Sequence, residues 1–133
     1  MPTVDTLAAL RQAAAGLTYQ SETDAPWSPF AWPDAGGVLT GEEVRRRGKE
    51  KLNARIQERT LDALFGPLVQ LQDWYGDEEK RDAAKNQSLF DAVKRLLTNP
   101  KVFHIGDRKV AIYIVGNASE GGWAGLKTMA AET

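Results

Sequence analysis

The stretch VFHIGDRKVAIYIV, residues 102–115, decides the fold. Gly106-Asp107 divides it into two runs of β-branched and aromatic residues, and two such runs around a glycine turn are a strong signal for a β-hairpin. The second run is apolar at every position from 110 to 115. A strand of that kind is buried on both faces, so we predict a central strand that helices cover on each side of its sheet.

The elements on either side of this hairpin follow from the same reasoning. The spacing predicts the longest helix over Asp77–Thr98, with acidic residues at its positive N-terminal end and Asn99-Pro100 as its stop. Its apolar stripe consists of Ala83, Leu89, Phe90, Val93, Leu96 and Leu97. After the hairpin we predict a turn at Gly116-Asn117, a break at Gly121-Gly122 and a last strand over Leu126–Ala131.

The N-terminal part of the chain predicts one helix and one edge strand. Apolar residues recur at helical spacing over Thr6–Leu17, and Gly16 is placed to end that helix in the left-handed conformation. The aromatic-rich residues 27–32 form a short extended stretch that contains Pro29. Because proline cannot donate to a strand ladder, this stretch fits the edge of a sheet.

The middle of the chain predicts three short elements. Thr40-Gly41-Glu42-Glu43 matches a capping box, and Gly48 interrupts the helix that it begins. An alternating strand follows over Leu52–Arg59. Residue 60 then caps a short helix that runs to residue 64 and ends at Gly66-Pro67.

These elements together predict an α/β fold: a three-layer α/β/α sandwich with a mixed, largely antiparallel sheet, in a single domain over residues 1–133. The chain is 42% hydrophobic and 26% charged, which is sufficient for a real core. Its apolar runs are shorter than the roughly 18–20 residues of a membrane span. Residues 1–17 lack the pattern of a secretory signal.

The composition also excludes several kinds of chemistry. The chain has no cysteine, so it has no disulfide, thiolate metal site or cysteine nucleophile. It has one histidine, His104, which argues against a multi-histidine metal site and against a serine–histidine–aspartate triad. In the predicted hairpin the His104 side chain alternates away from its neighbours, which favours a surface or hydrogen-bonded histidine over a general base. The formal net charge of −1 argues against a general nucleic-acid binder.

The net charge hides an uneven distribution. Residues 45–59, here called the basic segment, hold seven of the 17 basic residues and two of the 18 acidic ones, so this segment is +5 and the rest of the chain is −6. Such an asymmetry fits a surface that meets a partner. A solvated helix face is the alternative, and on general grounds it is the more common one.

Two features suggest binding of a partner. In Gln72-Asp73-Trp74-Tyr75, large aromatic residues stand beside an acid before the long helix; core packing is the commoner role of such aromatics, and an exposed tryptophan beside acids anchors protein interfaces. The second feature is the end of the chain, Ala131-Glu132-Thr133. Its carboxylates and hydroxyl are hard oxygen ligands of the type that Mg²⁺ prefers.

With these features the sequence resembles the nuclease A inhibitor family, whose members inhibit sugar-non-specific, metal-dependent endonucleases. Four blocks carry the resemblance: Ser21-Glu22-Thr23-Asp24 followed by Pro26, Gln72-Asp73-Trp74-Tyr75-Gly76-Asp77-Glu78-Glu79, Asn99-Pro100-Lys101-Val102 with the strand end Ile112–Gly116, and the terminal Glu132-Thr133. With the pattern between them they cover about residues 6–33 and 71–133. Residues 34–71 fit the family poorly, and the arginine run 45–47 has no counterpart in it.

The resemblance implies an α/β/α sandwich without enzymatic activity and without a cofactor of its own. It implies that Thr133 reaches into the active site of a nuclease and binds the catalytic metal ion there, with Glu132 beside it. It also implies that Glu22 pairs with a basic residue of that site, and that Asp73 and Trp74 contribute to the interface. The metal bridge then belongs to the nuclease, and this chain alone is not expected to hold Mg²⁺ tightly.

The leading hypothesis is therefore a monomeric, cytoplasmic protein inhibitor of an endonuclease, with no direct contact to nucleic acid or membrane. The alternative is an interaction module on the same fold that binds another protein and inhibits nothing; the divergent residues 34–71 and the basic segment favour it. A nucleic-acid binder is a third hypothesis. It is the weakest, because the basic segment has no interleaved aromatic residues for stacking on single strands.

Overall fold

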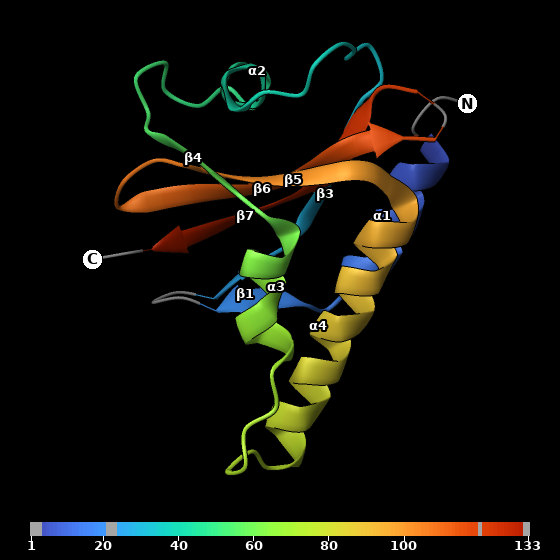
Figure 1. Cartoon of the computed structure of the whole chain (residues 1–133), viewed down its shortest axis with the longest axis vertical. Helices are drawn as coiled ribbons and strands as arrows, with labels where there is room; N and C mark the ends of the chain where they lie inside the picture. The colour runs from blue at the N-terminus through green and yellow to red at the C-terminus, as the bar shows by residue number, and fades with distance from the viewer. Residues whose placement is uncertain (1–3, 21–23, 120, 132–133) are drawn as a thin grey trace.

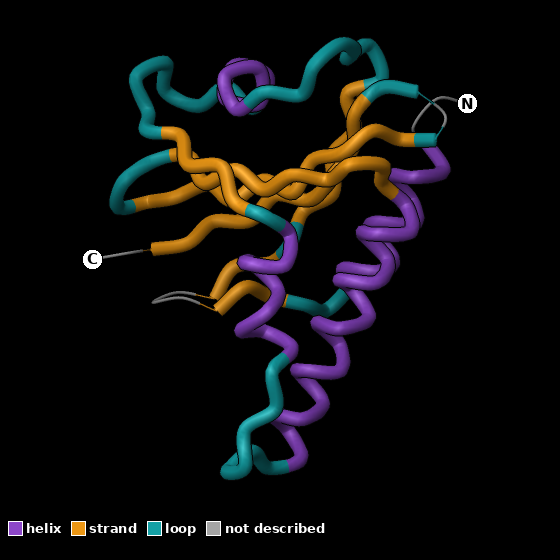
Figure 2. Tube along the Cα trace, viewed as in Figure 1, coloured by secondary structure: helices purple, strands orange, loops and turns teal. Residues whose placement is uncertain are grey.

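The computed structural model describes residues 4–20, 24–119 and 121–131. Its helices are α1 (Val4–Ala14), α2 (Gly41–Arg47), α3 (Leu61–Val69) and α4 (Asp77–Leu96). Its strands are β1 (Thr18–Gln20), β2 (Asp24–Pro26), β3 (Ser28–Trp32), β4 (Ile56–Arg59), β5 (Leu97–Ile105), β6 (Lys109–Ala118) and β7 (Trp123–Ala131). Figure 2 shows how these elements and the loops between them are distributed. No helix in the described ranges has both the length and the apolar character needed to cross a membrane.

The main sheet has five strands in the order β3-β7-β6-β5-β4. As the sequence predicts, β6 is the central strand, and its residues from 110 to 116 are buried. Every pairing described in this sheet is antiparallel, so the prediction of a mixed sheet is wrong. The reason is local: tight hairpins join β5 to β6 and β6 to β7, and such turns connect antiparallel strands only. Strands β1 and β2 form a separate two-stranded ribbon.

A hydrophobic cluster lies on each face of the sheet. In Figure 1, α1, α3 and α4 lie below the sheet and α2 lies above it. The lower cluster joins side chains of the three longer helices to alternate residues of the strands, among them Leu10, Phe65, Leu89, Ile112, Ile114 and Leu126. The upper cluster joins Val44 of α2 to Phe103, Tyr113 and Trp123. The upper face is thus covered by a helix of seven residues and by the loops on either side of it.

The long helix and the strand after it refine the sequence prediction. Helix α4 begins at Asp77 as predicted and ends two residues early, because Leu97 is already extended and buried in the sheet. Asn99-Pro100 therefore does not stop the helix; it lies inside β5, at a bulge in the pairing with β6. Asn99 has φ of 51°. A bulge is one of the few places in a strand that tolerates proline, since it leaves a backbone group outside the ladder.

Helix α3 extends beyond its predicted end. Thr60 caps it as expected, and its hydroxyl oxygen accepts from the backbone N–H of Ala63 at 3.0 Å. The helix then continues through Gly66-Pro67 to Val69. Packing outweighs the local signal here, since Phe65 is fully buried and stacks on Phe90 of α4 at 5.0 Å between ring centroids.

Two other predictions in loops and turns are wrong. The strand over Leu52–Arg59 contains only β4, because the chain turns at residues 51–54 and leaves Leu52 79% exposed. The turn at Gly116-Asn117 is absent, since both residues continue β6. Gly116 instead permits close packing: a Cβ there would lie 2.8 Å from the Cβ of Leu97. The predicted left-handed end of the first helix is confirmed, with φ of 77° at Gly16.

Candidate partner-binding surface

The loop between α3 and α4, residues 70–76, carries Asp73 and Trp74 at the tip of a helical hairpin that projects away from the sheet (Figure 1). The backbone N–H of Tyr75 donates to the carbonyl of Gln72 at 3.1 Å, which closes a turn. The rings of Trp74 and Tyr75 meet edge to face, with centroids 4.6 Å apart. Trp74 is 73% exposed, so it does not pack in the core and its ring is available to a partner.

Acidic residues gather next to this tip for a structural reason. The backbone N–H of Gly76 donates to Glu79 Oε2 at 3.1 Å, and residues 77–79 place three carboxylates on the first turn of α4. Negative charge at a helix N-terminus is stabilising by itself. Within the described ranges no group of three or more histidine, aspartate or glutamate side chains has the geometry of a metal site. The acids at the tip are therefore caps and surface charge.

The end of β7 lies beside the β1–β2 ribbon. The hydroxyl of Thr128 is within hydrogen-bonding distance of two carbonyl oxygens of β2, that of Ala25 at 3.2 Å and that of Pro26 at 3.0 Å. Glu22, Glu132 and Thr133 lie outside the described residues. The strands from which these segments leave, β1, β2 and β7, are thus fastened together, and Figure 1 shows their ends on the same side of the molecule.

The described elements that carry the predicted contact residues, or from which their segments leave, therefore lie on two separate parts of the molecule. One part is the edge where the β1–β2 ribbon meets β7; the other is the tip with Asp73 and Trp74, at the far end of α4 (Figure 1). The described elements do not bring Asp73 and Trp74 next to the end of β7. A partner that touches both parts has to span the side of α3 and α4 between them.

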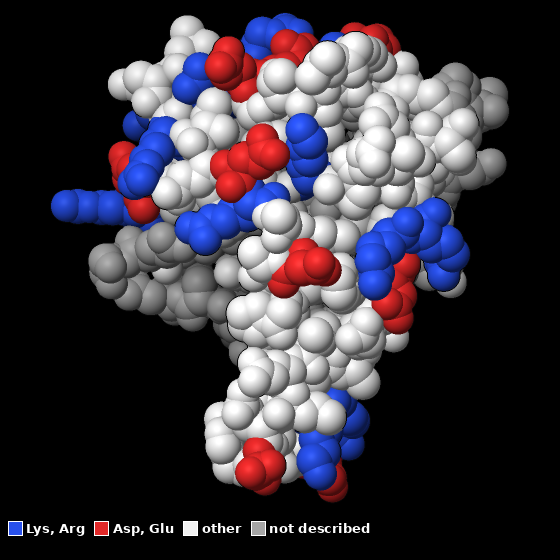
Figure 3. Space-filling view, in the orientation of Figure 1, with Lys and Arg blue, Asp and Glu red and all other residues white. Residues whose placement is uncertain are grey.

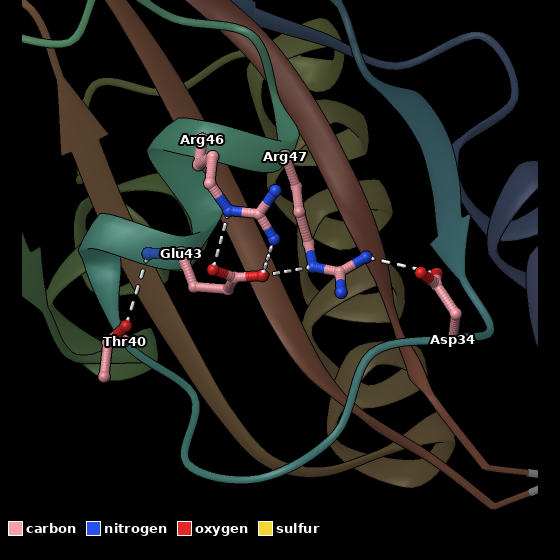
Figure 4. A network of polar contacts seen from close by, with 5 residues as sticks. All are labelled: Asp34, Thr40, Glu43, Arg46 and Arg47. Carbon is pink, nitrogen blue, oxygen red and sulfur yellow. Dashed lines mark hydrogen bonds and ion pairs between the residues drawn. The ribbon is translucent and has the colours of Figure 1, made fainter.

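The arginine run of the basic segment is held by contacts within the molecule, and Figure 4 shows those of Arg46 and Arg47. Arg46 makes a two-pronged ion pair with Glu43, and Arg47 Nε donates to the same carboxylate at 2.7 Å. Arg47 Nη1 also donates to Asp34 Oδ1 at 3.1 Å, and Arg45 Nη1 donates to the carbonyl of Ala54 at 2.9 Å. The hydrogen bond from Arg46 holds the pKa of the Glu43 carboxyl below its ordinary value.

These contacts change the interpretation of the basic segment. Arg46 and Arg47 share one carboxylate, and Arg47 is mostly buried against the ring of Trp123, with its guanidinium 5.8 Å from the ring centroid. Thr40 caps α2 as predicted, by accepting from the N–H of Glu43 at 3.3 Å. Arg47 therefore links α2 to β7, and the carboxylates of Glu43 and Asp34 offset part of the charge of the run.

A second polar group links the same layer to the central strand. The hydroxyl of Tyr113 donates to Glu50 Oε2 at 2.5 Å, and Lys127 Nζ lies 3.1 Å from the same oxygen. Lys127 also stands over the ring of Tyr113, 5.2 Å from its centroid. Burial, and then the hydrogen bond to Glu50, raise the pKa of Tyr113 well above its ordinary value of 10.0.

We expect this phenol to make the protein less stable at high pH. A raised folded-state pKa means that the unfolded chain releases the Tyr113 proton first, so the stabilisation is complete below the ordinary pKa of 10.0 and is lost as pH rises above it. Urea unfolding at a series of values from about pH 9 to pH 11 measures this effect. In the Tyr113→Phe variant, the part of the decline in unfolding free energy that is due to the phenol should vanish. A decline of equal slope in both proteins would contradict the assignment.

His104 lies where the sequence analysis predicts a structural histidine. Its strand neighbours Phe103 and Ile105 belong to the upper cluster, so the imidazole faces the helices on the opposite side of the sheet. There it is half-buried and lines a shallow pocket with Arg59 and Leu64. The other polar side chains in that pocket lining are Tyr19 and Arg59, and no carboxylate or second imidazole joins them.

Two residues near the candidate surface, Thr128 and Leu71, were not predicted from the sequence. Thr128 is a buried polar residue between Leu126 and Ala130 on the inner face of β7, and a polar side chain at such a position needs a hydrogen-bond partner. That rule was the available signal for the contact with β2. Leu71 is 63% exposed near Trp74 and enlarges the apolar tip; its local pattern contains no sign of this exposure.

Comparison with known families gives one match that covers nearly the whole chain. The family model described as nuclease A inhibitor-like protein matches residues 4–133. The match includes residues 34–71, which the sequence analysis set apart from the family. No curated protein matches the chain. Because the family model covers nearly the whole chain, the chain belongs to the nuclease A inhibitor-like family.

Proposed function

We propose that this protein inhibits a metal-dependent, sugar-non-specific endonuclease by occupying its active site. The family match over residues 4–133 carries this proposal. The exposed Trp74 supports it, because a large apolar side chain on the surface contributes most where a partner buries it. We propose further that the protein has no enzymatic activity, that it is a cytoplasmic monomer, and that α2 with its loops is the third layer of an α/β/α sandwich.

The proposed mechanism uses oxygen ligands as a substitute for a phosphodiester. A non-specific nuclease holds phosphates in a basic groove around a hydrated Mg²⁺ ion. In this proposal the terminal Thr133 supplies oxygen ligands to that ion, with the Glu132 carboxylate beside it. Glu22 and Asp73 pair with basic residues of the groove, which speeds encounter and fixes the docking geometry. Such an inhibitor needs no cofactor, since the ion belongs to the nuclease.

Titration decides this proposal. The purified chain is added to purified magnesium-dependent, sugar-non-specific endonucleases that are cutting plasmid DNA. We expect cleavage by the cognate enzyme to stop near equimolar inhibitor. The proposal would be contradicted if cleavage by every such nuclease continued at a large excess of the chain. The non-inhibitory interaction module would then be the function, and a pull-down that recovers a non-nuclease partner through residues 45–59 would identify that partner.

Replacement of the exposed tryptophan separates binding from folding. Trp74→Ala should raise the inhibition constant by about 30-fold, the effect of losing an interface residue worth about 2 kcal/mol. The free energy of unfolding should change by less than about 0.5 kcal/mol, because the ring is mostly in solvent. The matched control is Val38→Ala, since Val38 is 81% exposed on the loop before α2. Equal inhibition by both variants would remove Trp74 from the interface.

A further inference from the structure

Four cationic side chains outside the arginine run lie near one another at one end of the sheet. Lys51 and Arg55 precede β4, Arg108 lies in the turn between β5 and β6, and Lys109 is the first residue of β6. The backbone N–H of Gly106 donates to the carbonyl of Arg55 at 2.8 Å, which places the two segments side by side. Within the described part of the chain these four side chains form no ion pair. Figure 3 shows blue side chains along this left edge, with red ones between them.

Three of these cations border one hollow, here called the basic hollow. It is a cavity of about 600 Å³ whose lining includes Lys51, Asn53, Arg108, Lys109, Ile105 and Met129. The cations are part of this lining, and the 38%-exposed Met129 adds apolar surface, whereas Ile105 is buried beneath it. Of the two carboxylates in the lining, Glu50 is bound by Tyr113 and Lys127. Asp107 alone remains against three cations, so the basic hollow is positive and partly apolar.

We propose that the basic hollow binds an acidic segment of a protein partner that also carries an apolar side chain. Positive charge in the lining fits carboxylates, and the exposed Met129 fits an apolar side chain beside them. A nucleic acid fits less well: the Asp107 carboxylate repels phosphates, and the lining contains no aromatic ring on which a base could stack.

The position of the basic hollow indicates that the partner is the nuclease, and this step rests on the proposed function. Lys109 pairs across the sheet with Ala131, so the basic hollow adjoins the end of β7. A nuclease that takes the terminus of this chain into its active site therefore reaches the basic hollow too. The partner surface beside that active site is acidic. Attraction there counters the repulsion that a basic segment would otherwise meet on a basic nuclease.

The identity of the partner can be tested by measuring association kinetics with a nuclease that the wild-type chain inhibits. The double variant Arg108→Glu/Lys109→Glu should associate about tenfold more slowly at low ionic strength, and the difference should shrink as salt is added. The control is Arg11→Glu/Arg95→Glu, which makes the same change of charge on exposed helix residues and should stay within about twofold of wild type. Equal slowing by both double variants would overturn the nuclease as the occupant.

A peptide probe tests the basic hollow without any nuclease. A short synthetic peptide of alternating glutamate and leucine should shift the amide resonances of Asn53 and Gly106, and Arg108→Glu/Lys109→Glu should abolish the shifts. This result would stand even if titration showed no inhibition, so the two proposals fail separately. The proposal would be overturned if no shifts were seen or if short duplex DNA gave equal shifts. It would also be overturned if shifts were seen only after removal of residues 132–133, because the terminus of the chain would then be the occupant of the basic hollow.

Discussion

Deletion of Thr133 should raise the inhibition constant of the chain by about a hundredfold or more, because it removes the residue proposed to bind the metal ion of the nuclease. Loss of a residue that supports a metal site commonly lowers affinity by about 10–100-fold, and a ligand at the centre of an interface has at least this effect. Inhibition of plasmid cleavage at a fixed nuclease concentration measures the change. Folding should be unaffected, since the deleted residue lies beyond the end of β7 at Ala131.

Two companion variants locate the effect within the terminal residue. Thr133→Ser keeps the hydroxyl and the free carboxylate, so it should inhibit nearly as well as the wild type. A Gly-Ser extension after Thr133 keeps the side chain but moves the free carboxylate away, so it should weaken inhibition as strongly as the deletion does. If the extended and native chains inhibited equally, inhibition would be real and the metal bridge would be wrong.

The parts of the fold that the sequence predicts correctly are those in which local pattern and packing agree. In α4 the apolar residues recur at the helical period, and Ala83, Leu89 and Val93 of the predicted stripe are buried. Around Gly106 the turn residues separate two β-rich runs, and β5 and β6 pair there as a hairpin. The apolar run 110–115 predicts a central strand, and the sheet order confirms it.

The errors arise where packing outweighs a local signal. Pro67 ends a helix in isolation, but Phe65 is buried against α4 and the helix continues. Asn99-Pro100 predicts a helix end, yet Leu97 has already entered the sheet and the pair is accommodated in a bulge. A single sequence contains no information about which neighbour arrives from elsewhere in the chain, so such cases need the tertiary structure.

The candidate surface was predictable in residue type but not in placement. Asp73 and Trp74 fit either a plug for the sheet or an interface anchor, and only the 73% exposure of Trp74 distinguishes these roles. The basic segment was ambiguous for the same reason. Its arginines pair with Glu43 and with Asp34, which is 13 residues from Arg47, and the +5 charge counted from the sequence overstates what a partner meets.

Strand β7 should be the least tolerant part of the sheet, and Gly125→Ala tests this. A Cβ at Gly125 would lie 1.7 Å from the carbonyl oxygen of Ile114 and 3.0 Å from the Phe30 ring, so β7 would have to move away from β6. We expect the free energy of unfolding, measured in urea, to fall by about 3 kcal/mol or more.

Gly66→Ala is the matched control for that strand substitution. Gly66 lies in α3, where an added methyl group would meet nothing within 4 Å apart from its own chain neighbours and helix backbone; helix propensity favours the alanine and the following Pro67 disfavours it, so the same chemical change should alter the free energy of unfolding by less than about 1 kcal/mol. Because β7 holds the β1–β2 ribbon through Thr128, Gly125→Ala should also weaken inhibition, whereas Gly66→Ala should not. A Gly125→Ala protein of unchanged stability would contradict the register in which Val115 pairs with Gly125.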